Sequence, residues 1–172
     1  MRYICPLNFF FHCIMKITFR PICKEDHPFL KKVYRSTREK ELLQTSWTEA
    51  EKQKFIEFQF NAQHSHYINA YKGAEFNIIM EKNTDIGRLY IWETEKQIRI
   101  MDIALLEEYT GKGIGTYLLK QLIQKSENGG KKLNIHVEYN NPALRLYERL
   151  GFKKTDNTGV YFFMEYLPGD KP

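Results

Sequence analysis

The sequence lacks a long apolar run, because no stretch approaches the ~18–20 residues that a membrane-spanning helix needs. It also lacks any block of like charge, since its 26 basic and 21 acidic residues are interleaved and leave a net charge of +5. Interleaved charge of this kind disfavours nucleic-acid binding, although a positive excess helps to attract an anionic ligand. These absences predict a globular protein that contacts neither membrane nor nucleic acid, and we expect it in the cytoplasm.

Cysteine is scarce and has no motif. Cys5, Cys13 and Cys23 lie near the start of the chain without a Cys-x-x-Cys spacing, which disfavours a disulfide framework and favours a reducing compartment. His64 and His66 point to different sides of a helix, and no other cluster has the spacing of zinc ligands. A Gly-x-Ser-x-Gly nucleophile motif is also missing. We therefore expect no bound metal and no covalent nucleophile.

The length of 172 residues suits one domain with a sizeable core. Residues 1–14 resemble a signal peptide only superficially, because proline and polar residues interrupt the apolar stretch and no cleavage site follows. A clean strand pattern starts at Met15. We expect residues 1–14 to be an extension outside the core fold, residues 15–167 to form a single domain, and residues 168–172 to be a tail.

Hydrophobic periodicity predicts an α+β fold, with helices on both faces of a mixed, mainly antiparallel sheet. Thr48 and Glu51 form a capping box at the start of a long second helix. Three strands on short connections predict an antiparallel meander, and the strand after the next helix should run parallel to its predecessor. The expected strands are 15–20, 75–81, 86–92, 98–105, 133–137, 152–155 and 160–166, and the expected helices begin near residues 25, 48, 114 and 142.

The chain is organised around residues 98–124, where an apolar strand leads into a glycine-rich turn and then into an amphipathic helix. The turn reads Gly111-Lys112-Gly113-Ile114-Gly115. A helix that starts at such a turn directs its unpaired backbone N–H groups and its positive dipole end toward an anion. The turn therefore predicts a phosphate site, and tight packing is the alternative reading of the same glycines.

A second motif follows about thirty residues later, where Asn140-Asn141-Pro142 opens a helix that carries Tyr147 and ends at Gly151-Phe152. With residues 110–115, it resembles the GNAT superfamily of N-acetyltransferases. The signatures of this superfamily are Arg/Gln-x-x-Gly-x-Gly/Ala and Asn-x-x-Ala-x-x-Leu-Tyr followed by Gly-Phe. The resemblance covers residues 15–167. It implies the acyl-CoA N-acyltransferase fold, in which about four helices flank a sheet of about six or seven strands with one splayed parallel pair.

The resemblance implies acetyl-CoA as a co-substrate. Its diphosphate would lie on the backbone of Gly111, Lys112, Gly113, Ile114, Gly115 and Thr116, and its pantetheine arm along Ile103, Ala104 and Leu105, with Asn140 and Ala143 at the helix entrance. Thr110 stands where the family usually has arginine or glutamine. We expect this exchange to weaken cofactor binding by ~1–2 kcal/mol, partly offset by the charge of Lys112.

The resemblance also implies direct attack of a primary amine on the thioester. Tyr147 would be the general acid that protonates the leaving thiolate, and a packed tyrosine with a satisfied hydroxyl is the alternative. His136, near the end of the second parallel strand, is the first candidate base. Asp102 on the facing strand is the second candidate, or it orients His136; deprotonation through water stays open.

The long second helix is aromatic over a broad arc, and Phe58, Gln59, Gln63 and Tyr67 are predicted to line the substrate pocket. The acceptor is a small-molecule or peptide amine that the sequence does not identify. The last two strands offer a surface for a homodimer, although no residue specifies one. The alternative function is a non-catalytic acyl-CoA-binding sensor, which the departure at Thr110 favours.

Overall fold

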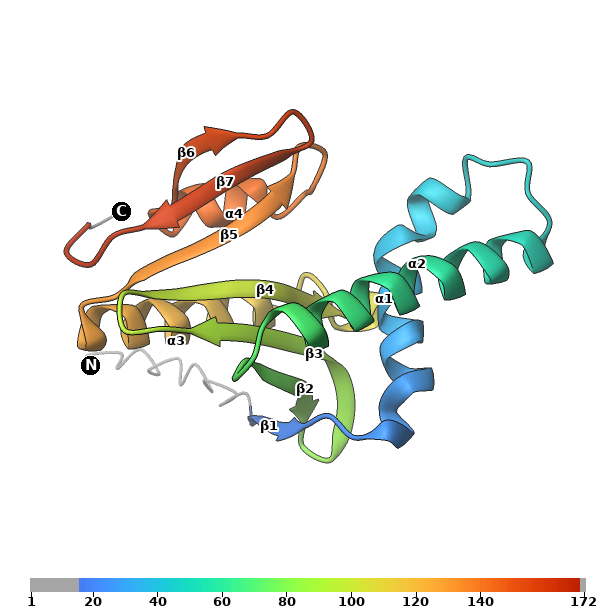
Figure 1. The fold of residues 1–172 in the computed structure, drawn as a ribbon, viewed down its shortest axis with the longest axis horizontal. Helices are drawn as coiled ribbons and strands as arrows, with labels where there is room; N and C mark the ends of the chain where they lie inside the picture. The colour runs from blue at the N-terminus through green and yellow to red at the C-terminus, as the bar shows by residue number, and fades with distance from the viewer. Residues whose placement is uncertain (1–15, 171–172) are drawn as a thin grey trace, which may run out of the picture.

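The computed structural model describes residues 16–170, so the predicted extension at residues 1–14 lies outside the described residues. One seven-stranded sheet has the strand order β1-β2-β3-β4-β5-β7-β6 (Figure 1). The strands are β1 (Ile17–Pro21), β2 (Glu75–Glu81), β3 (Thr84–Glu93), β4 (Gln97–Leu105), β5 (Lys132–Glu138), β6 (Lys153–Asn157) and β7 (Tyr161–Tyr166). The α-helices are α1 (His27–Leu42), α2 (Glu49–Ala70), α3 (Ile114–Gly129) and α4 (Leu144–Arg149), with 3-10 turns at Lys24–Asp26 and Glu107–Tyr109.

Helices cover both faces of the sheet, so the predicted three-layer α+β class is confirmed. Neighbouring strand residues point to opposite faces, and the two apolar layers therefore separate cleanly. Ile78 lies in the layer formed with α1 and α2, whereas Ile79 lies in the layer formed with α3 and α4. Within the described chain, no helix combines the length and apolar character needed to cross a membrane.

The predicted parallel pair is also confirmed, and it separates along its length. β4 and β5 pair only from Gln97 with Lys132 to Ile100 with Ile135. Beyond Ile100, β4 continues to pair with β3, while β5 continues to pair with β7. Figure 1 shows the two strands diverging toward the side on which α1 and α2 lie. The sheet thus consists of two halves joined at one end and open at the other.

Local sequence signals set several boundaries. Thr48 and Glu51 form the predicted capping box, since the Glu51 amide donates to the Thr48 hydroxyl and the Thr48 amide donates to the Glu51 carboxylate. The last helix is shorter than predicted and begins at Leu144. Before it, the Asn141 side chain accepts a hydrogen bond from the Ala143 amide and holds a turn.

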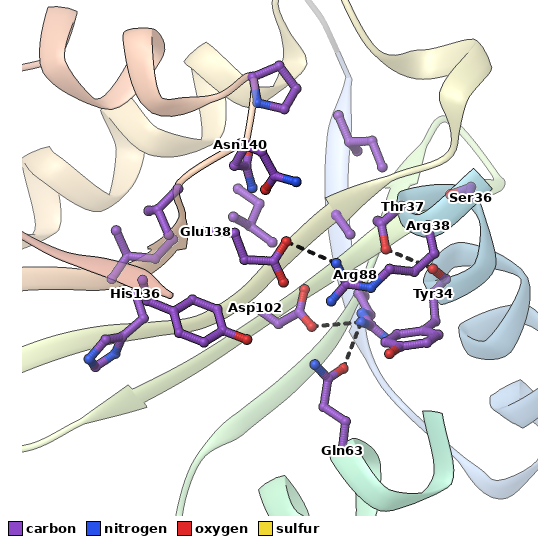
Figure 2. Close-up of a pocket in the computed structure, with 18 of the residues that line it drawn as sticks. Tyr34, Ser36, Thr37, Arg38, Gln63, Arg88, Asp102, His136, Glu138 and Asn140 are labelled. Carbon is purple, nitrogen blue, oxygen red and sulfur yellow. Dashed lines mark hydrogen bonds and ion pairs between the residues drawn. The ribbon is translucent and has the colours of Figure 1, made fainter. Parts of the chain in front are cut away.

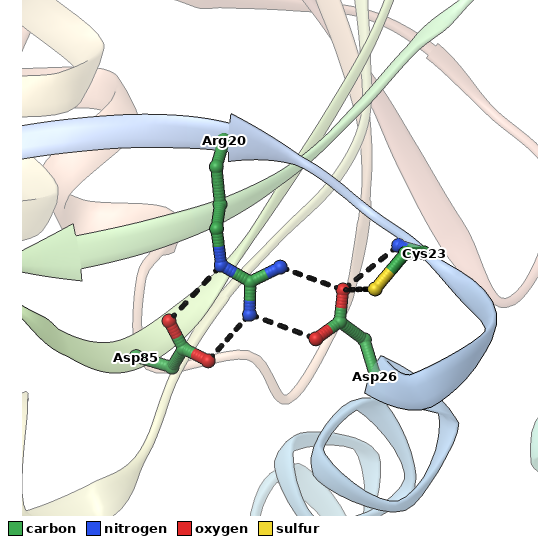
Figure 3. A network of polar contacts seen from close by, with 4 residues as sticks. All are labelled: Arg20, Cys23, Asp26 and Asp85. Carbon is green, nitrogen blue, oxygen red and sulfur yellow. Dashed lines mark hydrogen bonds and ion pairs between the residues drawn. The ribbon is translucent and has the colours of Figure 1, made fainter.

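A polar network that the sequence did not suggest fixes the start of α1 (Figure 3). The Arg20 guanidinium at the end of β1 donates two 2.7 Å hydrogen bonds to Asp26 and also pairs with Asp85 at 2.6 Å. Asp26 also accepts from the Cys23 amide. The guanidinium holds the pKa of Asp26 well below its usual range. The network fastens the chain leaving β1 to the β2–β3 hairpin and so positions α1 over the sheet.

Candidate active site

The opening between β4 and β5 belongs to a cavity with a volume of about 1060 Å³. Its walls come from both halves of the sheet and from α1, α2 and the loop before α4 (Figure 2). Of the residues predicted to bind the cofactor, Ile103, Ala104, Leu105, Thr110, Asn140 and Tyr147 line it. Beyond Ile100 the edge of β4 that faces β5 forms no ladder pairs, so its polar groups are available to a ligand.

The glycine turn follows Thr110, which lines this cavity; residues 111–116 are not among the lining residues, but their backbone amides are free. Among residues 16–170, no hydrogen-bond acceptor is found for the backbone N–H groups of residues 111–116. Gly111 and Gly113 have φ values of 69° and 84°, which side-chain-bearing residues rarely adopt. The turn therefore points its amides and the N-terminus of α3 outward as an anion site.

The side chains around the turn contribute less than its backbone. The Thr110 hydroxyl donates a 2.8 Å hydrogen bond to the Glu107 carbonyl, so it is engaged within its own turn. Lys112 extends its ammonium group over the Tyr109 ring, 5.2 Å from the ring centre. Ala143, which was predicted to contact the cofactor, packs against the core and does not line the cavity.

Tyr147 lies at the wall of the cavity with only 4% of its surface exposed. Its ring packs edge-on against Phe152, while its hydroxyl has no hydrogen-bond partner within the described residues. Burial raises the pKa of this phenol, and the nearby Asp102 carboxylate raises it further. Tyr147 therefore keeps its proton at physiological pH and can donate it to an atom within the cavity.

His136 and Asp102 both line the cavity, but each has an arginine as its partner. The His136 Nδ1 lies 2.9 Å from the Arg99 guanidinium, which donates to it. Figure 2 shows the imidazole pointing away from Asp102, so the prediction that Asp102 orients His136 is wrong. Burial, followed by the charge of Arg99, lowers the pKa of His136 below 6.5. The ring is therefore neutral at pH 7.

Asp102 forms the most buried ion pair of the site, a feature that sequence reasoning missed. The Arg88 guanidinium on β3 donates a 2.6 Å hydrogen bond to Asp102 and a 3.2 Å bond to Gln63. The guanidinium also lies within 6.0 Å of the centres of the Tyr34, Phe60 and Tyr90 rings. A charged residue inside the apolar stretch of residues 86–92 was the available signal, because a buried charge requires a partner.

A second ion pair spans the open end of the cleft. Arg38 on α1 lies 3.0 Å from the Glu138 carboxylate on β5 and 3.7 Å from Glu41 on its own helix. Figure 2 shows the side chains of Arg38, Glu138, Arg88 and Asp102 within the same cavity. Arg38 and Glu138 also line a neighbouring cavity of about 470 Å³.

The four predicted substrate residues of α2 do not converge. Gln63 and Tyr67 line the main cavity, and the Tyr67 hydroxyl donates to the Met101 carbonyl at 3.1 Å. Gln59 lines the neighbouring cavity. Phe58 is 70% exposed and lines neither of the two. At about 100° per residue, Phe58 and Tyr67 lie on opposite sides of the helix.

Among the described residues, no cluster of three or more metal-ligating side chains occurs.

Comparison of the sequence with known protein families identifies the family of this chain. The model described as "Acetyltransferase (GNAT) family" matches residues 31–152. This chain belongs to the GNAT acetyltransferase family. The match includes both motifs and most of the cleft walls, so the GNAT fold predicted from the sequence is confirmed.

Individual GNAT proteins resemble this chain over shorter stretches. An N-alpha-acetyltransferase of Saccharolobus solfataricus is 43% identical over 66 residues, which cover 37% of this chain and 40% of that protein. A [ribosomal protein bS18]-alanine N-acetyltransferase of Haemophilus influenzae is 34% identical over 85 residues, covering 49% of this chain and 58% of that protein. The chain thus matches only about half the length of these curated relatives.

Solved GNAT structures match the fold over most of the chain. PaiA N-acetyltransferase of Thermoplasma acidophilum, crystallised with coenzyme A, has a TM-score of 0.65 at 23% identity and covers 89% of this chain and 99% of that chain. A GNAT family acetyltransferase of Elizabethkingia anophelis with acetyl-CoA bound has a TM-score of 0.56 at 21% identity, with coverages of 88% and 97%. At these identities the similarity establishes the fold alone.

Proposed function

We propose that this protein is an acetyl-CoA-dependent N-acetyltransferase that acts on a primary amine. The proposal rests on three features: the free amides at residues 111–116, which follow the cavity-lining Thr110, the gap between β4 and β5, and the unpartnered hydroxyl of Tyr147 in the cavity wall. Acetyl-CoA supplies an activated thioester, and the protein's part is to bind, to orient and to move protons.

The protein holds the co-substrate mainly through its backbone. The amides of residues 111–116 bind the diphosphate, and the free edge of β4 at Ile103, Ala104 and Leu105 takes the place of a strand partner for the pantetheine arm. An N–H group on this edge also stabilises the oxyanion that develops on the thioester. Asn140 contributes a side-chain amide from the loop before α4, and Tyr147 protonates the leaving thiolate.

The importance of the turn's backbone is tested by two neighbouring glycines. Gly113→Ala should raise the Kd for acetyl-CoA about tenfold. Alanine at this positive φ is strained by about 1–2 kcal/mol, and the backbone relieves this strain only by turning its amides away from the diphosphate. Gly115→Ala is the matched control, since its φ is not positive and its new Cβ meets no protein atom closer than 3.9 Å. Equal affinities of the two variants by calorimetry would contradict the backbone site.

The acceptor amine must lose a proton before it attacks, and His136 is the proposed base. Its Nδ1 takes this proton only when the Arg99 donor moves aside. Because the pKa of His136 lies below 6.5, kcat should rise with pH through a midpoint below 6.5. Arg99→Met should move this midpoint upward, since the cation that lowers the pKa is gone, and His136→Ala should abolish it. Unchanged pH–rate profiles in both variants would show that His136 is not the base and that Asp102 or a water molecule accepts the proton from the amine.

The acceptor class is the least constrained part of the proposal. The Saccharolobus relative is named an N-alpha-acetyltransferase, and the Haemophilus relative is named for N-acetylation of an alanine of ribosomal protein bS18, so a peptide N-terminus is the first acceptor to test. An α-amine has a pKa of about 8, so a larger fraction is neutral at pH 7 than for a lysine side chain. Small alkyl amines form the second class for the same assay.

A non-catalytic acyl-CoA sensor is the second candidate function. The observation in its favour is Thr110, whose hydroxyl is engaged by Glu107 and so cannot replace the arginine or glutamine that is usual there. Thiol release from acetyl-CoA in the presence of peptide and alkyl amines separates the two functions. Amine-dependent release supports the transferase, whereas binding of acetyl-CoA without release from any amine supports the sensor.

A further inference from the structure

The two ion pairs of the cavity differ in how firmly they are held. Arg88 and Asp102 have side chains only 3% and 13% exposed, and three aromatic rings surround the guanidinium. Arg38 and Glu138 are 22% and 25% exposed and join helix α1 to strand β5. The first pair is a fixed part of the wall, because opening it would leave a buried charge without a partner. The second pair is partly exposed to solvent and can open without that cost.

Arg38 has a second position available when it leaves Glu138. Glu41 lies one helical turn further along α1, already 3.7 Å from the guanidinium. The Tyr34 ring lies beneath the guanidinium, with its centre 5.6 Å from the guanidinium carbon. Opening the Arg38–Glu138 pair therefore exchanges one carboxylate for another and leaves Glu138 with an unpaired negative charge.

This negative charge stands where an acceptor has room to approach. The neighbouring cavity of about 470 Å³ meets the main cavity at this pair, and its other walls include the Phe55 and Tyr139 rings and Val160. Its charged residues are Arg38, Glu41 and Glu138, so it carries one more negative charge than positive. Such a surface complements a cation with an apolar body and repels the phosphates of coenzyme A.

We propose that Glu138 binds the ammonium group of the incoming acceptor. Arg38 stays paired with Glu138 until the acceptor displaces the guanidinium toward Glu41. The proposal rests on the proposed function and narrows its substrate class to amines that arrive protonated and carry an apolar or aromatic flank. The acceptor would enter through the smaller cavity and reach the thioester by passing between α1 and β5.

Calorimetry of the full chain saturated with coenzyme A tests this without turnover, using phenethylamine as the cationic probe and phenethyl alcohol as its neutral counterpart. Arg38→Met should tighten phenethylamine binding about threefold to tenfold, because the competing guanidinium is gone. Glu138→Gln should weaken it about tenfold or more, to the level of phenethyl alcohol. Arg35→Met is the matched control, since Arg35 pairs with Glu39 and Glu49 on the same side of the molecule and lines neither cavity; it should change nothing.

Several outcomes would overturn the proposal: weaker probe binding in Arg38→Met, unchanged binding in Glu138→Gln, or no probe binding to wild type and Arg38→Met alike. Coenzyme A affinity, measured on each variant, shows that the fold is intact. The readout is also separate from the proposed function. If no amine is acetylated while Arg38→Met still tightens phenethylamine binding, the transferase assignment fails and the ammonium site stands.

Discussion

Tyr147→Phe should lower kcat by about 10²–10⁴-fold while the KM for acetyl-CoA stays within about twofold. The substitution removes only the hydroxyl group, and the aromatic ring should keep its contact with Phe152. Without the hydroxyl, the leaving thiolate has no proton donor at this wall of the cavity. Steady-state kinetics with a reactive amine, together with the melting temperature, measures both effects.

The matched control is Tyr166→Phe. Tyr166 is another buried tyrosine, but its hydroxyl donates to Glu127 and it does not line the cavity. This variant should lose some stability and keep its kcat. A Tyr147→Phe enzyme with wild-type kcat would return Tyr147 to a packing role and leave thiolate protonation to solvent.

Arg88→Met should produce the largest loss of stability, about 3–5 kcal/mol, because it leaves the Asp102 charge without its partner in a largely buried place. Burial is the largest single influence and lowers the pKa of the Arg88 guanidinium, but the charge and hydrogen bond of Asp102, together with Tyr90 and Tyr67, outweigh it and the pKa is raised. The two charges therefore depend on each other. Urea unfolding, monitored by circular dichroism, gives the free energy of unfolding.

Adding Asp102→Asn to Arg88→Met gives the decisive comparison. The double variant has no unpaired charge, so it should recover about half or more of the lost stability. If Arg88→Met costs less than about 1 kcal/mol, or if the second change adds to the loss, the pair is not the fixed element described above. The same double variant also shows whether the acceptor site needs the Asp102 carboxylate, through its KM for the amine.

The parts of the fold that follow from neighbouring residues were predictable. The strand, glycine turn and helix at residues 98–124 have their signals within a few residues of one another, as does the Thr48–Glu51 capping box. The separation of β4 from β5 was expected only through the family resemblance. Periodicity gives a strand its faces but does not say where its pairing stops.

Contacts between distant residues were not predictable. Arg38 and Glu138 are 100 positions apart, and each reads in the sequence as one more surface charge. Asp102 and His136 were correctly placed on facing strands, yet each pairs with an arginine that the strand pattern does not connect to it. The position of Phe58 was unpredictable for a different reason, since an aromatic arc that covers most of a helix does not show which side meets the cavity.

The central claim is that the amides of residues 111–116 bind the diphosphate of acetyl-CoA. Nuclear magnetic resonance of the ¹⁵N-labelled protein, titrated with coenzyme A and in parallel with pantetheine, tests it directly. Coenzyme A should shift these amide signals downfield and slow their hydrogen exchange, whereas pantetheine, which lacks the diphosphate, should leave them unchanged and shift the signals of Ile103, Ala104 and Leu105. If coenzyme A binds and the signals of residues 111–116 stay unchanged, the site lies elsewhere and the account is wrong.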